Sequence, residues 1–343
     1  MSSVKQTKSH KTHHGTTGKT VGVVVVGLIV LAVAMITSLT VGSSSMSFGE
    51  LRAFIDPALP TPSPLRTSIL TELRIPRILM AAFVGAILAV CGVVMQAITH
   101  NDLAEPYLLG ISSGASTGAV VAILFSTWQY GIIVGAAIGA LASFFMLILL
   151  LQKSAADATR VVLTGVLIGF LFQSLTSLIV TASGNAESTR GIMFWLLGVL
   201  SAARWHTFWA VAIIGTLGIA LLWSLSRYLD ALSLGDATAQ TMGIPVVALR
   251  YTVLIAVSLM TAATVASVGA IGFVGLIVPH AIRMLNGPRH VTLIPLSALL
   301  GAISLVVADA IARALIAPQE LPVGVITALI GVPAFFVILR RKR

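Results

Sequence analysis

Long apolar runs free of charge dominate this chain, and short polar gaps separate them. Most runs approach 20 residues, about the length of helix that crosses the 30 Å hydrocarbon core of a bilayer. We expect ten spanning helices, at Val21–Val41, Ile78–Thr99, two within Pro106–Gln152, Val161–Ala182, His206–Ser226, Tyr251–Val268, Gly272–Leu285, Thr292–Ile311 and Val323–Leu339. The pattern predicts an all-α polytopic membrane protein, with residues 20–343 forming a single ten-helix domain.

Composition excludes the soluble classes. Of 343 residues, 57% are hydrophobic and 9% are charged, whereas a soluble domain carries about 25% charged residues. A chain with so few charges is neither a soluble enzyme, nor a secreted scaffold, nor a disordered chain.

The basic residues give an orientation. The net charge is +10, and the positive charges lie at the chain ends and in gaps between apolar runs, without interleaved aromatic residues, so we expect no nucleic-acid partner. With both termini cytoplasmic, the cytoplasmic side holds 14 of the 21 lysines and arginines, including all six lysines, as the positive-inside rule requires. The outer side then holds Arg52, Arg66, Arg74, Arg77, Arg190, Arg204 and Arg313.

The first 19 residues are expected to form a disordered basic tail. Gly15–Thr20 resembles the end of a phosphate-binding loop, but His13 stands where that motif needs glycine and no strand precedes it. We therefore expect no ATPase site in this chain. The first apolar run also resembles a signal peptide with Ala32-Val33-Ala34 as a cleavage site, although its continuation to Val41 favours a retained anchor.

The sequence offers little evidence for a metal site or a redox site. His10, His13 and His14 offer a metal-binding face only if the tail is helical, and no acidic or cysteine ligand is near them. Cys91 is the single cysteine and lies in an apolar run, so we interpret it as a buried structural thiol. We expect no metal site, no catalytic residue and no cofactor.

The two halves of the chain look related. Gly85-Ala86-Ile87, followed by Asn101–Pro106, aligns with Gly269-Ala270-Ile271, followed by Gly272–Pro279. The second to fifth spans would then correspond to the seventh to tenth in opposite orientation, an inverted repeat of the kind that builds transport pathways.

Charges near the membrane call for a reason, because burying them is costly. Asp309 and Arg313 are four residues apart on one helix face and are able to pair. Arg74 and Arg77 flank Pro76, which begins the second span and holds both at the outer surface. They either anchor phospholipid or dock an acidic partner.

The polar segment Arg227–Arg250 lies between the sixth and seventh spans. Ser233 or Asp236 is able to cap a short helix there, and Gly243 is able to end it before Pro245. Such a helix either lies on lipid or is gripped by a cytoplasmic motor.

Several long motifs resemble the FecCD-type permeases of ABC importers, which take up iron-siderophores, haem or cobalamin. The motifs occur in family order over about residues 20–343. They are Leu73–Arg77, Gln96–Pro106, Leu109–Ala115, Gly269–Arg283, Ala308–Arg313 and Glu320–Gly324. Asp102 departs from the family pattern, which usually has proline there, and this change is expected to loosen the turn.

The resemblance implies a type II importer fold, a homodimer in the cell membrane and a pathway along the dimer axis. It also implies two ATPase subunits, which carry the ATP and Mg, on the coupling loop 227–247. The coupling residues it implies are Leu234, Gly235, Asp236, Ala239, Gln240 and Gly243.

Two further sites follow from the resemblance. Asp157, Ala158, Thr159 and Arg160 match the cytoplasmic gate, and a short external helix matches Gly191–Gly198. Arginines that match Arg74, Arg77 and Arg313 dock an extracellular or periplasmic substrate-binding protein. Treated as exposed rim charges, these arginines should each be mildly sensitive to replacement by alanine.

The alternative from another class is an ion-coupled secondary transporter that uses Asp309 or Glu105, and an intramembrane enzyme is a more distant one. Among importer substrates, iron-siderophore comes first, then haem, then cobalamin, an order that rests on family frequency.

Overall fold

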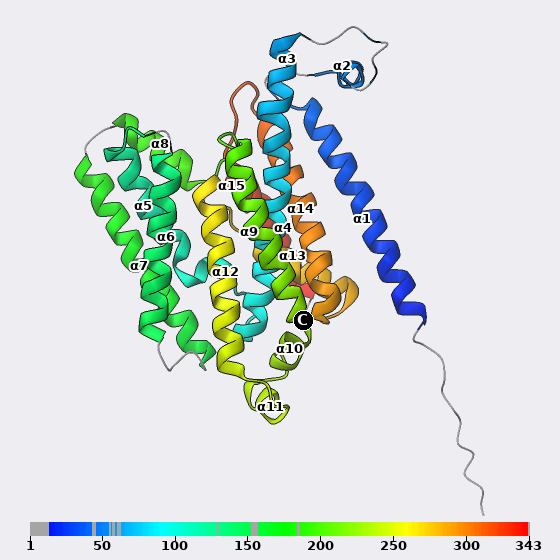
Figure 1. Cartoon of the computed structure of the whole chain (residues 1–343), viewed down its shortest axis with the longest axis vertical. Coiled ribbons are helices and arrows are strands. Elements are labelled where there is room, and N and C mark those ends of the chain that lie inside the picture. The colour runs from blue at the N-terminus through cyan, green and yellow to red at the C-terminus, as the bar shows by residue number, and fades with distance from the viewer. Residues whose placement is uncertain are drawn as a thin grey trace, which may run out of the picture.

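The computed structural model describes residues 14–42, 46–54, 56, 59, 63–128, 130–151, 157–183 and 186–341. These residues are almost entirely helical (Figure 1). The helices are α1 (His14–Thr40), α2 (Phe48–Ala53), α3 (Pro64–Ser68), α4 (Ile75–Thr99), α5 (Ile111–Phe125), α6 (Gly131–Leu151), α7 (Ala158–Ser183), α8 (Ala186–Leu196), α9 (Trp205–Ser224), α10 (Ser226–Leu232), α11 (Asp236–Thr241), α12 (Val246–Val268), α13 (Val274–Asn286), α14 (His290–Ala314) and α15 (Val323–Arg341).

Every predicted span corresponds to one helix, and the all-α membrane fold is confirmed. Seven of the described helical segments are long and apolar enough to cross a membrane, while α5, α13 and α15 are shorter or less apolar. The predicted tail differs at its end, because α1 begins at His14 rather than near residue 20. Extending an existing helix adds one hydrogen bond per residue without a new nucleation cost, so the apolar span propagates backwards. The rest of that tail, with His10 and His13, lies outside the described residues.

α4 is the central helix, and 83% of its apolar 18-residue stretch is buried inside the molecule. It packs against α14 and α13 at pairs of glycines. A Cβ on Gly85 would lie 2.2 Å from the carbonyl oxygen of Gly301, and one on Gly92 would lie 1.8 Å from that of Gly275. Without side chains at these crossings the backbones approach closely, which is how membrane helices gain packing energy.

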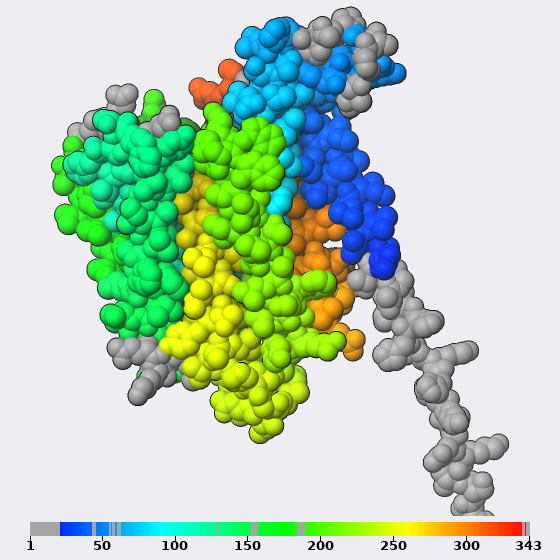
Figure 2. All heavy atoms as spheres, in the orientation of Figure 1, coloured from blue at the N-terminus to red at the C-terminus, as the bar shows by residue number. Residues whose placement is uncertain are grey.

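α1 lies at the edge of the molecule, where it packs mainly on α14 (Figures 1 and 2). Only 6% of its apolar 18-residue stretch is buried inside the molecule, so most of the surface of α1 is left to face lipid. α5, α6 and α7 form a separate group on the opposite side (Figure 1).

The two ends of the helix bundle differ in shape. α2 and α3 project from one end, here called the α3 end, and α10 and α11 project from the other, the α11 end (Figures 1 and 2). Trp205 and Trp209 stand at the start of α9 near the α3 end, and Trp223 stands near its other end, where Nε1 donates to the carbonyl of Val291 at 3.0 Å. Tryptophan at both ends of one helix is typical of the two membrane interfaces.

Candidate functional site

The first site is an arginine cluster at the α3 end, made of Arg74, Arg77, Asp309, Arg313 and Glu320. Asp309 is fully buried and joins two cations. Its Oδ1 accepts from Arg77 Nε at 3.0 Å and Nη2 at 2.9 Å, and its Oδ2 accepts from Arg313 Nε at 3.0 Å. Arg77 Nη1 also donates to Glu320 Oε2 at 2.8 Å. The cluster thus joins α4, α14 and the segment before α15.

The same cluster holds the end of α1. Arg313 Nη1 donates to the carbonyl of Ser38 at 3.1 Å and to that of Val41, and its Nη2 donates to Ser38 Oγ. Arg74 Nη1 donates to the carbonyl of Leu39. The last carbonyls of a helix lack intrahelical partners and carry partial negative charge, so two guanidinium groups cap α1 where its dipole favours cations.

The sequence predicted this cluster only in part. The Asp309–Arg313 pair is confirmed. The expectation of exposed rim arginines is wrong for Arg74 and Arg313, which are 7% and 3% exposed, because they turn toward Asp309 and the α1 carbonyls. Neither Ser38 nor Glu320 was predicted as a partner, since no local pattern relates either residue to the cluster.

The second site is formed by the short helices α10 and α11 and the residues next to them. The six predicted coupling residues lie in α11 and in the turns on either side of it. Gly235 has φ +107° and Gly243 has φ +79°, so left-handed glycines stand on both sides of α11. The helical stop before Gly243 is confirmed. The capping expectation is wrong, since α11 has no side-chain N-cap bond: Ser233 Oγ donates back to the carbonyl of Leu229, and Asp236 binds Arg250.

Asp236 and Arg250 form a latch with the end of α4. Arg250 Nη2 donates to Asp236 Oδ1 at 2.9 Å, to Asp236 Oδ2 at 3.1 Å and to the carbonyl of Ile98 at 3.3 Å. The Arg250 side chain is fully buried and that of Asp236 is 31% exposed. The latch therefore joins α11, α12 and α4.

Two more polar links connect α10 with the bundle. His100 Nε2 lies 2.8 Å from the carbonyl of Leu232. Asp230 Oδ1 accepts from the backbone N–H of His290 at 2.8 Å and lies 2.7 Å from its Nδ1. α10 is thus joined to the end of α4 and to the start of α14.

The turn that contains Asp102 is held by two side-chain contacts. The backbone N–H of Leu103 donates to Asn101 Oδ1 at 2.9 Å, and Asp102 Oδ1 lies 3.2 Å from Arg283 Nη1. Asp102 thus ties the turn to α13.

The predicted gate residues lie at the start of α7. Asp157 Oδ1 accepts from the N–H of Thr159 at 2.9 Å and from that of Arg160 at 3.4 Å, while Oδ2 lies 3.5 Å from Arg160 Nε. Asp157 therefore caps α7, which begins at Ala158. All four residues lie together at the start of α7.

Two breaks in the helical backbone meet in the bundle. Pro106–Leu109 forms a 3₁₀ turn before α5, and an irregular stretch with Gly269 (φ +77°) precedes α13. Tyr107 Oη donates to the carbonyl of Ile271 at 2.9 Å and accepts from its N–H at 2.8 Å. Irregular backbone at membrane depth is stable where protein groups satisfy its hydrogen bonds. Here the Tyr107 hydroxyl bonds both the N–H and the carbonyl of Ile271.

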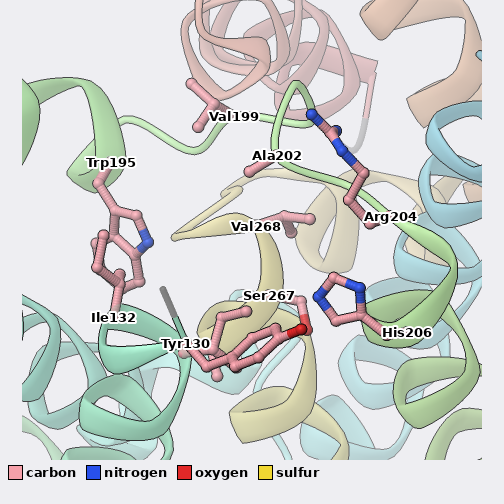
Figure 3. A pocket seen from close by; sticks show the side chains of 11 residues that line it. Tyr130, Ile132, Trp195, Val199, Ala202, Arg204, His206, Ser267 and Val268 are labelled. Atoms are coloured by element: carbon pink, nitrogen blue, oxygen red, sulfur yellow. The ribbon is translucent and has the colours of Figure 1, made fainter. Parts of the chain in front are cut away.

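A cavity of about 330 Å³ opens near the α3 end between α6, α8, α9 and α12 (Figure 3). Trp195, Tyr130 and His206 present rings to it from three directions (Figure 3). Arg204 lies at its edge, with Nη1 donating to the carbonyls of Ser201 and Ala203 at 2.9 and 2.8 Å. The cavity adjoins α8, the short helix expected at Gly191–Gly198.

Comparison with known proteins places this architecture. The FecCD transport family matches residues 30–341. The chain is 37% identical over 332 residues to an uncharacterised ABC transporter permease protein of Bacillus subtilis, covering 93% of each chain. It is 41% identical over 276 residues to the cobalamin import system permease protein of Halobacterium salinarum, covering 80% of this chain and 74% of that one.

Two further similarities agree. The chain is 40% identical to the Fe(3+) dicitrate transport system permease protein of Escherichia coli, covering 80% of this chain and 86% of that one. A solved metal-chelate type ABC transporter in an inward-facing conformation superposes with a TM-score of 0.83 at 32% identity, covering 93% of this chain and 99% of that chain. The chain therefore belongs to the FecCD transport family, and it is a membrane-embedded permease of the ABC importer type.

Proposed function

We propose that this permease moves a metal chelate inward, an iron-siderophore first, with haem or cobalamin as the next candidates. The observation that carries the proposal is the match in sequence and fold over nearly the whole chain, to relatives named for cobalamin and ferric dicitrate and to a metal-chelate type transporter. FecCD permeases work with ATPase and substrate-binding partners in ABC importers. Here we propose a homodimer with two separate ATPase subunits, and no ATPase site in this chain.

We assign the α11 end to the cytoplasm, with both termini on that side. The assignment is supported by the basic residues, since Arg227 and Arg289 are exposed there while all six lysines fall in the same predicted compartment. The ATPase would bind α11 and its flanks, where Leu234 is 67% and Met242 is 61% exposed. Apolar side chains in an otherwise polar loop suit a protein contact.

The opposite end then faces the substrate-binding protein. The arginine cluster carries three cations and two carboxylates, a net +1 per copy that two-fold symmetry doubles. Glu320 is 33% and Arg77 is 12% exposed, so a glutamate of the partner would reach Arg77 by displacing Glu320. Arg74 and Arg313 would act by contributing to the positive field, which raises the association rate and fixes orientation.

The secondary-transporter alternative loses Asp309, one of its two candidate residues. Both carboxylate oxygens of Asp309 accept hydrogen bonds from arginine, which leaves it poorly suited to exchange a coupling ion. The gate role of Asp157–Arg160 remains part of the importer proposal, supported by their position at the start of α7 beside the cytoplasmic end.

Reconstitution tests the proposal directly. Proteoliposomes would contain the chain with the ATPase that copurifies with it, and the substrate-binding protein would be added outside. We expect ATP-dependent uptake of ferric hydroxamate, ferric citrate, haem or cobalamin, and none with ATPase-free vesicles. Ion-driven uptake by the chain alone would overturn the proposal, and uptake confined to cobalamin would overturn the substrate order.

A further inference from the structure

We propose that Arg250 is the positioning residue through which α11 moves α4, so that the latch couples ATP hydrolysis to transport. This inference rests on the proposed function and adds a residue outside the coupling loop. The guanidinium of Arg250 donates to the carboxylate of Asp236 on one side and to the carbonyl of Ile98 on the other. Arg250 therefore connects α11, the helix that would contact the ATPase, with α4, the most buried helix of the bundle.

Burial makes this junction stiff. Arg250 has no exposed surface, and a buried cation that loses its carboxylate is left uncompensated in a low-dielectric interior. Asp236 stands directly after Gly235, whose left-handed backbone begins α11. A displacement of α11 must therefore carry Arg250 with it or break the latch.

The acceptor at the far side is also well placed. Ile98 lies in the last turn of α4, where carbonyls lack intrahelical partners. A positive charge at a helix C-terminus is favourable, so Arg250 binds α4 at its C-terminal end. A displacement of Arg250 would act there along the axis of α4. At its other end α4 begins directly after Arg74 and carries Arg77, so one continuous helix connects the latch with the arginine cluster.

The other links at the α11 end are suited to hold α10 rather than to transmit motion. His100 binds the carbonyl of Leu232 in α10, and Asp230 of α10 binds His290 at the start of α14. Among the described polar contacts, the latch is the side-chain bond that joins α11 to a spanning helix. A break at Arg250 should therefore separate ATP hydrolysis from α4 while leaving α10 in place.

The main test uses the whole complex of permease, ATPase and substrate-binding protein in proteoliposomes. Arg250→Met keeps the apolar stem of the side chain and removes its charge, and Asp236→Asn keeps the shape of its partner. Arg289→Met is the matched control, because Arg289 is an exposed arginine at the same end. We expect Arg250→Met to copurify with the ATPase and to hydrolyse ATP, with at least tenfold less ferric hydroxamate, ferric citrate or cobalamin taken up per ATP. Asp236→Asn should likewise lower the uptake per ATP. Asp236→Glu should restore most of the uptake.

A second measurement works without a substrate. Nitroxide labels on Thr238→Cys in α11 and Leu73→Cys before α4, in a Cys91→Ala background, report the distance between the two elements. In the native latch, ATP binding should leave this distance narrow and unchanged, whereas with Asp236→Asn it should broaden or shift. Unchanged distances in the variant, or uptake per ATP equal to that of the control, would overturn the latch. Absence of any ATPase from the purified native complex would instead overturn the proposed function.

Discussion

The two charged regions at opposite ends of α4 are built on different principles. In the arginine cluster one carboxylate, Asp309, is fully buried and shared by two arginines. At the α11 end the carboxylates act singly and stay in contact with water, with side-chain exposures of 31% for Asp236, 37% for Asp230 and 46% for Asp102.

This difference separates a fixed joint from a movable one. Removing one partner of a buried shared pair leaves a charge without solvent, whereas a carboxylate that is one-third exposed regains hydration when its bond opens. The arginine cluster therefore fixes α1, α4 and α14 to each other. At the α11 end the contacts of Asp230 and Asp102 are able to break and remake, while the fully buried Arg250 keeps the latch closed.

The largest effect should come from Asp309→Ala. Two buried guanidinium groups lose their shared carboxylate, so we expect a loss of about 3–5 kcal/mol in stability. The thermal unfolding midpoint of the detergent-solubilised protein measures it. Glu50→Ala is the matched control, since its ion pair with Arg66 is exposed at 38% and 40% and should contribute about 0.2–1 kcal/mol. Equal shifts for the two variants would contradict the fixed-joint interpretation.

Arg313→Met should loosen the end of α1. Hydrogen bonds to a charged group contribute about 1.5–3 kcal/mol each, and this substitution removes those to Ser38 and Val41. We expect faster hydrogen exchange over residues 38–42 with little change over α12. Arg52→Met, whose side chain is 76% exposed in its pair with Asp56, should leave exchange in α1 unaltered.

Gly243→Val should distort the coupling loop without a steric clash. No atom lies within 4 Å of an added Cβ, but φ is +79°, and a left-handed β-branched residue costs about 1–2 kcal/mol. We expect weaker ATPase copurification and a small fall in the unfolding midpoint, because the strain is confined to this loop. Gly243→Asn tolerates this backbone better and should retain most of the binding; equal losses for the two variants would argue against a conformational role.

The smallest effect should come from Asp102→Asn. Its pair with Arg283 is partly exposed, so we expect a loss of about 0.2–1 kcal/mol that shrinks at high salt. A salt series of unfolding midpoints measures it. A large, salt-independent loss would show that this turn belongs to the fixed part of the molecule.

The docking proposal for the arginine cluster is sharpened by the same comparison. The early expectation of mild Arg→Ala effects assumed exposed side chains. Because Arg74 and Arg313 cap α1, their replacement combines a folding effect with any docking effect. Arg77→Gln and Glu320→Gln test the exposed part of the cluster. The affinity of each variant for the substrate-binding protein is measured over a salt series, and the two are compared.

The sequence by itself determined the local features of this protein. Helix length and apolar composition depend on consecutive residues, so all ten spans were predictable, as was the helical stop before Gly243. The Asp309–Arg313 pair was predictable because residues four apart share a helix face.

Only the tertiary structure decided which charges meet across the bundle. Arg77 and Asp309 are 232 positions apart, and Arg250 lies 152 positions from the Ile98 carbonyl that it binds. Such contacts depend on the depth and rotation at which helices cross, and glycine contacts such as Gly92 with Gly275 set both. A pattern read along one helix holds no information on that crossing, which is why the buried arginines were expected at the surface.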